Sequence, residues 1–345
     1  MHLPSTVTLL AAGRLALGNQ SSLDRDWTIS EDEVLVRDVC IIGGGSSGTY
    51  AAIRLQQLNK SVIVVEKNDH LGGHTETFTD PTTGKAVDYG VVNFEETTIS
   101  TAYFQHLGIR WEGWEGGNPA KWQKIGLDAG KLIGEPTESL QNSDERLGGD
   151  TLLSAQVVQV SRDRESTQLV VDTPSGRQQI RAKKLIVTIP PLVNDLRFMD
   201  LHPREIDLFH QFAHGYLYTG LVRVDGFPSD VATVVPGLIV VHFGSDIPLT
   251  DEEVQEQAVE QLLRFRQAGV DISQPEIVIM KSHAPYELRV SPQAIVDGFY
   301  DNLNSLQGYQ GTFWTGVAFE THDSQQIWKF TEQLIQDQVL KSLEE

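Results

Sequence analysis

Two short runs of β-branched residues near the N-terminus, joined by a glycine turn and an amphipathic stretch, give the clearest pattern in the chain. Residues 34–42 (VLVRDVCII) and 61–65 (SVIVV) have the continuous apolar composition of buried parallel strands. Between them, residues 49–58 carry apolar side chains at helical spacing. Strand, turn, helix and strand in this order predict a Rossmann-type βαβ unit.

The turn between the first strand and the helix reads GGGSSG at residues 43–48, which matches the fingerprint G-x-G-x-x-G. In such a turn Gly43 permits the tight bend, Gly45 lets the backbone approach a pyrophosphate, and Gly48 lets the helix pack close to the strand. A glycine turn that binds nothing is the alternative. The two strands around the turn favour a dinucleotide site.

An acidic residue, Glu66, follows the second strand directly. A carboxylate at this position accepts hydrogen bonds from the ribose hydroxyls of a dinucleotide, and it repels a 2′-phosphate. NADP is therefore disfavoured, whereas the βαβ unit alone leaves NAD and FAD open. The rest of the chain contains no second glycine fingerprint that would indicate a separate NADPH site.

Downstream, β-branched runs predict further strands, and amphipathic runs predict three helices. Strands are expected at residues 150–160 and 182–191, a hairpin at residues 168–180, and the helices at residues 251–268, 291–306 and 324–343.

Charge and cysteine content exclude several classes of protein. The chain has 47 acidic and 27 basic residues, a formal charge of -20, and a field of this sign repels nucleic acid and anionic lipid surfaces. Cys40 is the single cysteine among 345 residues, so the chain can form no intrachain disulfide and no thiolate metal cluster. A membrane span needs roughly 20 apolar residues in a row, and no stretch has them. We expect a protein with a small-molecule substrate, no metal and no integral membrane segment.

The N-terminal residues 1–26 are expected to be either a leader or a cleaved secretory signal. The apolar run 7–12 favours a signal, while Arg14 interrupts it. Asn19 lies in a glycosylation sequon, which matters only in the secretory pathway. The protein is accordingly expected to be secreted or lumenal if the signal is genuine, and cytoplasmic otherwise.

Later motifs extend the comparison beyond the βαβ unit. The sequence continues after Glu66 with LGGHT at residues 71–75 and DYG at 88–90, and it contains TFWTG at 312–316. In these motifs the chain resembles the flavin-containing amine oxidase superfamily, and in particular fungal FAD-dependent oxidoreductases of the beta-cyclopiazonate dehydrogenase family. The resemblance covers most of the chain from Trp27 onward.

The resemblance implies an α/β fold in which a Rossmann-type FAD-binding domain is interleaved with a reduced substrate domain of mixed sheet and helices. Residues 34–100, 146–195 and 305–345 would form the FAD-binding domain, and residues 101–145 and 196–304 the substrate domain.

FAD is expected to be non-covalent, because Cys40 lies in the first strand and the attachment cysteine of the superfamily has no counterpart; His74 leaves a route to a histidyl link. The cofactor-binding residues implied are Gly43, Gly45, Ser46, Ser47, Gly48, Glu66, Lys67, Gly72, Gly73, His74, Val158, Thr315 and Gly316.

The resemblance further implies an FAD-dependent dehydrogenase or oxidase that acts on a small-molecule intermediate of fungal secondary metabolism, with hydride transfer to flavin N5. The alternatives are a truncated FAD-binding pseudoenzyme, since the chain is shortened near residues 111–147 and 225–236, and a non-redox flavin isomerase or cyclase. The oligomeric state stays open.

His322 and Asp323 are the candidate catalytic residues, with a helix cap as the alternative role. Lys281 is a weaker candidate that could equally be a surface residue. Other candidates for a substrate cavity, each with core packing as its alternative, are Tyr216, Tyr218, His242, Phe243, His283, Tyr286 and Trp314.

Overall fold

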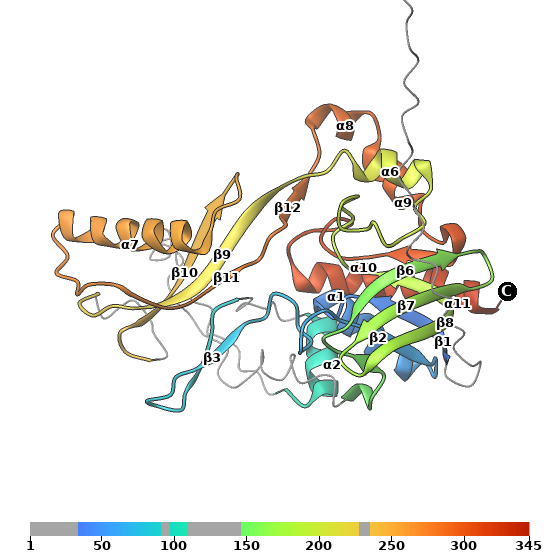
Figure 1. Ribbon diagram of the computed structural model, residues 1–345, viewed down its shortest axis with the longest axis horizontal. Coiled ribbons are helices and arrows are strands. Elements are labelled where there is room, and N and C mark those ends of the chain that lie inside the picture. The colour runs from blue at the N-terminus through green and yellow to red at the C-terminus, as the bar shows by residue number, and fades with distance from the viewer. Residues whose placement is uncertain (1–33, 91–96, 110–145, 228–234, 345) are drawn as a thin grey trace, which may run out of the picture.

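The computed structural model describes residues 34–90, 97–109, 146–227 and 235–344, which form two lobes, each built on its own sheet (Figure 1). The larger lobe contains a seven-stranded sheet, and the smaller lobe contains a four-stranded sheet. Among the described helices, none is long and apolar enough to cross a membrane.

Three predictions fall outside the described residues. These are the leader or signal at residues 1–26 with its sequon at Asn19, most of the shortened stretch 111–147, and the middle of the stretch 225–236. They stay predictions.

The expected βαβ unit is present at the centre of the larger sheet. Strand β1 (Leu35–Ile42) pairs in parallel with β2 (Val62–Val65), and helix α1 (Ser46–Gln57) connects them. The helix begins three residues earlier than its apolar pattern indicated, because the last glycine of the turn already has helical geometry. The strand order in this sheet is β5 (Thr151–Leu152), β2, β1, β8 (Gly176–Val187), β7 (Thr167–Thr173) and β6 (Gln156–Arg162).

The predicted strand at 150–160 is wrong in one respect, because it is two strands at different places in the sheet. β5 (Thr151–Leu152) pairs with β2, whereas β6 (Gln156–Arg162) pairs with β7 (Thr167–Thr173). Ser154, between them, has a positive φ of 49°, which turns the chain from one strand to the other.

The separate strand predicted at 182–191 is also corrected. It continues the second strand of the expected hairpin, so that β8 (Gly176–Val187) is one long strand. Its first half pairs with β7 in an antiparallel ladder, and its last residues pair in parallel with β13 (Thr312–Trp314). β7 and β13 follow one another along one edge of β8, and β1 pairs with its other edge in parallel. A short 3-10 turn (Tyr309–Gly311) precedes β13.

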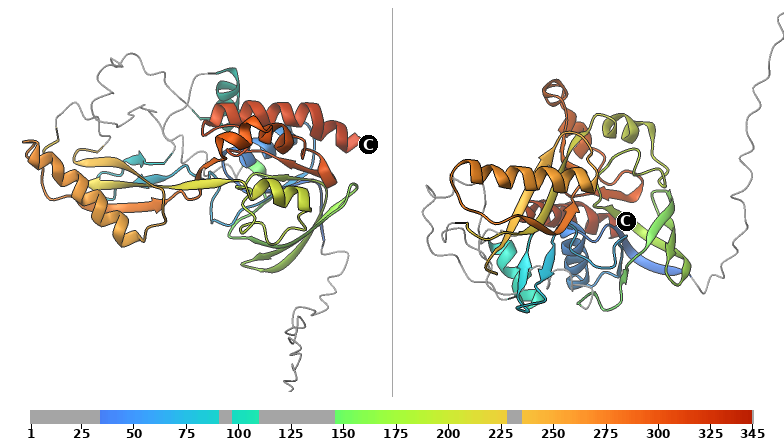
Figure 2. Two further views of the ribbon diagram at one scale, coloured as in Figure 1. Left: turned by 90° about the horizontal axis from the view of Figure 1, so that it is seen from above. Right: turned by 60° about the vertical axis from the view of Figure 1, so that its left-hand side comes forward.

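The predicted C-terminal helix covers one face of the larger sheet (Figure 2). It consists of α10 (Ser324–Leu334), one π turn (Ile335–Val339) and α11 (Leu340–Glu344). α10 packs against α1 and against α2 (Thr98–Leu107), where Trp328 is fully buried.

The smaller lobe is an antiparallel sheet. Its strands are β9 (Ala213–Arg223), β10 (Leu238–Ser245), β11 (Glu276–Ser282) and β12 (Tyr286–Arg289).

The helix predicted at residues 251–268 is α7 (Asp251–Gln267), which covers this sheet; Leu262 on its buried face packs with Val222 and Ile239. The helix begins with a capping box formed by Thr250 and Glu253. A hairpin of β3 (Thr77–Thr79) and β4 (Ala86–Asp88) packs against the same sheet through Val87 and Leu221.

The single helix predicted at 291–306 is wrong, because two short helices, α8 (Pro292–Val296) and α9 (Phe299–Asn304), take its place. Gly298 separates them with a φ of 82°, which a continuous helix cannot accommodate. The apolar pattern is helical on both sides, and Gly298 interrupts it.

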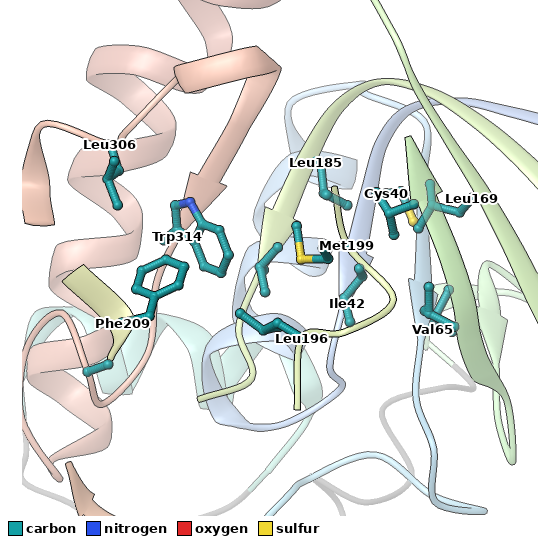
Figure 3. Packing of buried hydrophobic residues seen from close by; sticks show 14 of the residues in the cluster. Cys40, Ile42, Val65, Leu169, Leu185, Leu196, Met199, Phe209, Leu306 and Trp314 are labelled. Carbon is teal, nitrogen blue, oxygen red and sulfur yellow. The ribbon is translucent and has the colours of Figure 1, made fainter. Parts of the chain in front are cut away.

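The core of the larger lobe extends from the sheet to the helices α9 and α6 (Pro203–Phe209) (Figure 3). Trp314 of β13 is fully buried and contacts Phe209 edge to face, with ring centroids 4.9 Å apart. Each such side chain contributes roughly 1.5–3 kcal/mol on burial. Parts of both expected domains share this core, and the domain boundaries given above stay predictions.

Candidate functional site

The glycine turn after β1 has a shape that side chains would prevent. Gly43 has a φ of 100°, and a Cβ atom there would lie 2.5 Å from Thr188 Oγ1. A Cβ atom at Gly48 would lie 1.9 Å from the carbonyl oxygen of Gly43. Both glycines are therefore required by packing, as the fingerprint predicted, and they place the start of α1 directly above the end of β1.

The start of α1 presents unoccupied backbone donors. Gly45 is the N-cap residue, no side chain caps the helix, and its first turn contains no acidic residue. The first N–H groups of a helix have no intrahelical partner, and together with the helix dipole they favour an anion. Ser46 and Ser47 contribute two of these groups, and their role in binding a diphosphate stays a prediction.

Glu66 is 6% exposed and lies at the end of β2, beside the glycine turn. Its Oε2 accepts a hydrogen bond from the N–H of Gly44 at 2.7 Å, and its Oε1 accepts one from the N–H of Asn68 at 2.9 Å. Each carboxylate oxygen retains a further lone pair for a ribose hydroxyl. The two backbone N–H groups hold the carboxylate in place and leave each oxygen able to accept a further hydrogen bond.

A second glycine turn, Gly72-Gly73, lies against the first. The N–H of Gly72 donates to Gly44 O at 2.8 Å, and Gly45 and Gly72 form an isolated parallel bridge. A Cβ atom on Gly73 would be 2.9 Å from the Cα of Gly45. Two backbone surfaces without side chains thus face each other, and such a surface suits the close approach of a diphosphate.

The predicted closing turn, Thr315-Gly316, adjoins this cradle. A Cβ atom at Gly316 would lie 3.1 Å from Thr188 O and 3.5 Å from Ser47 Oγ. The side chain of Thr315 is directed away from the cradle, because its Oγ1 lies 2.7 Å from Thr331 Oγ1 of α10. Thr315 therefore fixes α10 with its side chain and leaves Gly316 to face the site.

Two predicted residues lie at the margin of the cradle. Val158 is at a bulge in β6, three residues after Ala155, whose N–H donates to Glu66 O at 2.9 Å. Lys67 is exposed, and its charge faces His74. The structure thus brings the segment around Val158 to the acid that ends β2.

The start of α10 converges on the start of α1. Ser324 Oγ lies 3.2 Å from Ser46 Oγ, and the indole N–H of Trp328 donates to Ser46 O at 3.1 Å. Asp323 is the N-cap residue of α10, and its carboxylate accepts from the N–H of Gln326 at 2.8 Å. The capping role that was the alternative for Asp323 is thus present.

His322 lies beside the rim of the smaller lobe. Its ring centroid is 4.4 Å from that of Tyr286 on β12. Partial desolvation lowers the pKa of His322, and the carboxylate of Glu287 opposes this shift. A neutral imidazole at neutral pH is able to accept a proton.

A cluster that joins the two lobes includes one residue that sequence reasoning missed. Glu76 is buried, and its Oε2 accepts hydrogen bonds from Lys281 Nζ at 2.8 Å and from the hydroxyl of Tyr89 at 3.3 Å. The rings of His74 and His283 are parallel, with centroids 4.2 Å apart. The alternation of polar residues at 74 and 76 was the available signal.

Known protein families give a match at the N-terminal part of the chain. The family described as NAD(P)-binding Rossmann-like domain matches residues 41–107, which include the glycine turn, Glu66 and the second glycine turn.

Three curated fungal proteins are similar over nearly the whole chain. FAD-dependent oxidoreductase oblC of Cochliobolus heterostrophus is 27% identical, and the alignment covers 97% of each chain. FAD-dependent oxidoreductase dbaF of Emericella nidulans is 28% identical over 96% of this chain and 97% of its own. Beta-cyclopiazonate dehydrogenase of Aspergillus flavus is 25% identical over 96% of this chain and 99% of its own.

The alignment with the first of these proteins runs over 471 positions, although this chain has only 345 residues. The relative therefore contains internal segments without a counterpart here, as the expected shortening implied.

Solved structures show the fold. A fatty acid isomerase from P. acnes that produces CLA superposes with a TM-score of 0.66 at 15% identity, over 90% of this chain and 100% of that chain. A variant of putrescine oxidase superposes with a TM-score of 0.64 at 14% identity, over 89% of this chain and 100% of its own. The mixed α/β class and the Rossmann-type FAD-binding fold are confirmed. With FAD as the cofactor of its relatives and a cradle that fits a dinucleotide, the chain resembles the fungal FAD-dependent oxidoreductases, beta-cyclopiazonate dehydrogenase among them.

Proposed function

We propose that this protein is a non-covalent flavoenzyme that uses FAD to oxidise a small-molecule intermediate of fungal secondary metabolism. The observation that carries the proposal is the cradle, in which two glycine turns face each other beside the buried carboxylate of Glu66. Its relatives are named as FAD-dependent oxidoreductases, and they support the class of reaction.

Each part of the cradle has a separate task in holding the cofactor. The N–H groups at the start of α1 bind the diphosphate, because they carry partial positive charge and have no partner in the helix. Glu66 binds the hydroxyls of the adenosine ribose and excludes a 2′-phosphate. Gly316, against Ser47, lets the closing turn lie close to the bound nucleotide.

FAD, when bound, supplies the acceptor for the hydride that leaves the substrate. The protein then has to hold the substrate and remove one proton. His322 suits this second task, because the lowered pKa leaves its imidazole neutral near pH 7. Asp323 acts on the site indirectly, by capping α10 and so fixing where His322 lies.

A pair of glycine substitutions tests the cradle. Gly45→Ala adds a methyl group whose Cβ would be 3.8 Å from Gly73 Cα, an ordinary contact, so the fold tolerates it. The same methyl replaces the bare backbone that would let a diphosphate approach closely at Gly45. Gly244→Ala on β10 meets open space and serves as the matched control. We expect FAD affinity, measured by flavin fluorescence quenching, to fall at least roughly tenfold for Gly45→Ala and to stay unchanged for Gly244→Ala.

Spectroscopy separates the proposed function from its alternatives. The wild-type protein should be yellow after reconstitution with FAD, and an oxidisable substrate should bleach the flavin under anaerobic conditions. Turnover of a compound without net bleaching of the flavin would indicate an isomerase or cyclase. Bound FAD that no candidate biosynthetic intermediate reduces would indicate a pseudoenzyme. A folded protein that takes up no FAD would overturn the proposal.

A further inference from the structure

The indole N–H of Trp328 reaches the first peptide of α1. Trp328 lies on α10 and is fully buried, and its Nε1 donates a hydrogen bond to the carbonyl oxygen of Ser46 at 3.1 Å. This carbonyl belongs to the planar peptide between Ser46 and Ser47. In an α-helix the C=O of a peptide points toward the C-terminal end and its N–H toward the start. One rigid unit therefore accepts the indole bond at one end and presents the Ser47 N–H at the other.

Three aromatic rings fix the direction of this donor. Tyr50 of α1 stacks on the indole, with an interplanar angle of 14° and ring centroids 5.9 Å apart. Tyr103 and Phe104 of α2 meet the indole with their edges, at centroid distances of 4.8 and 5.7 Å. A close-packed ring has no room to change its rotamer. The indole N–H therefore stays directed at the Ser46 carbonyl.

Two further contacts keep α10 in place along α1. At the start of both helices, Ser324 Oγ lies 3.2 Å from Ser46 Oγ. Two turns further on, Arg54 donates to both carboxylate oxygens of Glu332, at 2.8 and 2.9 Å. A bidentate pair of this kind fixes geometry as well as adding energy. Trp328 thus contacts the first peptide of α1 from a helix that is itself held on either side of the contact.

The need to satisfy buried polar groups does not explain the bond. As the first residue of α1, Ser46 already has an intrahelical donor for its carbonyl, the N–H four residues on, so the indole is a second donor. The larger lobe also tolerates an unpaired indole, because Trp314 is fully buried and its Nε1 has no hydrogen-bond partner among the described residues. Hydrogen bonds in a chain polarise one another. A second bond to the Ser46 carbonyl therefore makes the Ser47 N–H a stronger donor.

We propose that Trp328 is a positioning residue for the cofactor, which holds and polarises the Ser46–Ser47 peptide so that the Ser47 N–H binds the diphosphate of FAD more tightly. The inference rests on the proposed function. Because Trp328 acts through this peptide, its effect is confined to the anionic part of the ligand. A nucleotide with a diphosphate gains affinity from the indole bond, whereas a nucleoside without phosphate gains none.

Ligands with and without the diphosphate test this inference. ADP and adenosine are each titrated in competition with FAD, and binding is followed by flavin fluorescence. Trp328→Phe removes the indole N–H and keeps an aromatic ring. We expect its affinity for ADP and for FAD to fall roughly two- to tenfold, the range of one hydrogen bond, and its affinity for adenosine to stay unchanged. A merely structural Trp328 would change the affinities for ADP and adenosine by the same factor or not at all, and either result overturns the inference.

Trp314→Phe is the matched control. It makes the same change of ring at a second fully buried position, where no hydrogen bond from the indole is lost. We expect the ratio of the ADP and adenosine affinities to equal that of the wild type. If Trp314→Phe lowered this ratio as much as Trp328→Phe does, loss of ring volume would account for the effect and the inference would be overturned.

A measurement on the wild type covers the case in which Trp328→Phe does not fold. The indole ¹H–¹⁵N signals of the six tryptophans are recorded in the FAD-free protein, alone, with ADP and with adenosine. A diphosphate bound to the Ser47 N–H strengthens the Ser46 carbonyl as an acceptor, so the Trp328 indole proton should shift downfield with ADP and not with adenosine. A Trp328 signal that ADP leaves unchanged overturns this inference and leaves the FAD-dependent function intact. A folded protein that binds neither ADP nor FAD overturns both.

Discussion

Glu66→Gln is the sharpest test of how the cradle is held together. The carboxylate accepts one backbone N–H on each oxygen, from Gly44 and from Asn68, and it is 6% exposed. A glutamine amide has one accepting oxygen, and its NH₂ group cannot accept. One of the two buried N–H groups must therefore lose its partner, and the remaining hydrogen bond loses its charge assistance.

The magnitude follows from these two losses. An unsatisfied buried donor costs about 1–3 kcal/mol, and a neutral acceptor is weaker than a charged one by about 1 kcal/mol. The free energy of unfolding of the FAD-free protein should therefore fall by about 2–4 kcal/mol. The ribose hydroxyls also lose a charged acceptor worth about 1.5–3 kcal/mol, which corresponds to roughly 10–100-fold weaker FAD binding.

Urea unfolding and flavin fluorescence titration measure the two effects independently. Glu260→Gln on α7 is the control, because Glu260 is exposed and pairs with Arg264 only across one helical turn. Such a pair contributes less than about 0.5 kcal/mol, and FAD affinity should not change. If Glu66→Gln bound FAD as tightly as the wild type, the assignment of Glu66 to the ribose would be refuted.

Three further predictions test other parts of the structure. Gly48→Ala would place a Cβ atom 1.9 Å from Gly43 O, so the start of α1 must shift. We expect the free energy of unfolding, measured in urea, to fall by about 1–3 kcal/mol. A change from glycine to alanine inside a helix is ordinarily stabilising. Arg162→Ala leaves the fully buried carboxylate of Glu205 without its partner and should lower the stability by about 3–5 kcal/mol, visible as a large drop in Tm. The pKa of His283 falls from 6.5 to about 3 on folding, so below pH 6.5 the unfolded state binds more protons and stability decreases as the pH falls. At pH 5 this group should cost the FAD-free protein about 2 kcal/mol relative to pH 7, and His283→Gln should remove that part of the acid-induced loss.

The cofactor cradle could be predicted from the sequence because its parts are local. Gly43 to Gly48 lie within one turn, and Glu66 follows the strand that pairs with β1. The spacing of glycines, strands and acid along the chain fixes their arrangement in space, since a βαβ unit has one handedness and short connections. The errors in the predicted fold lie where the pattern of apolar residues does not show that neighbouring residues pair with different strands. Residues 150–160 read as one strand, yet their two halves pair with different strands.

The ion pair of Glu76 and Lys281 could not be predicted for the opposite reason. Glu76 and Lys281 are 205 positions apart in the chain, and no residue near either one in the sequence indicates that they pair. Polar residues at alternate positions, as at 74 and 76, are common in extended segments. They indicate a pairing only once β11 is known to lie beside this segment. A sequence motif therefore identifies what holds the cofactor, whereas contacts such as the Glu76–Lys281 pair become visible only when the two lobes are placed together.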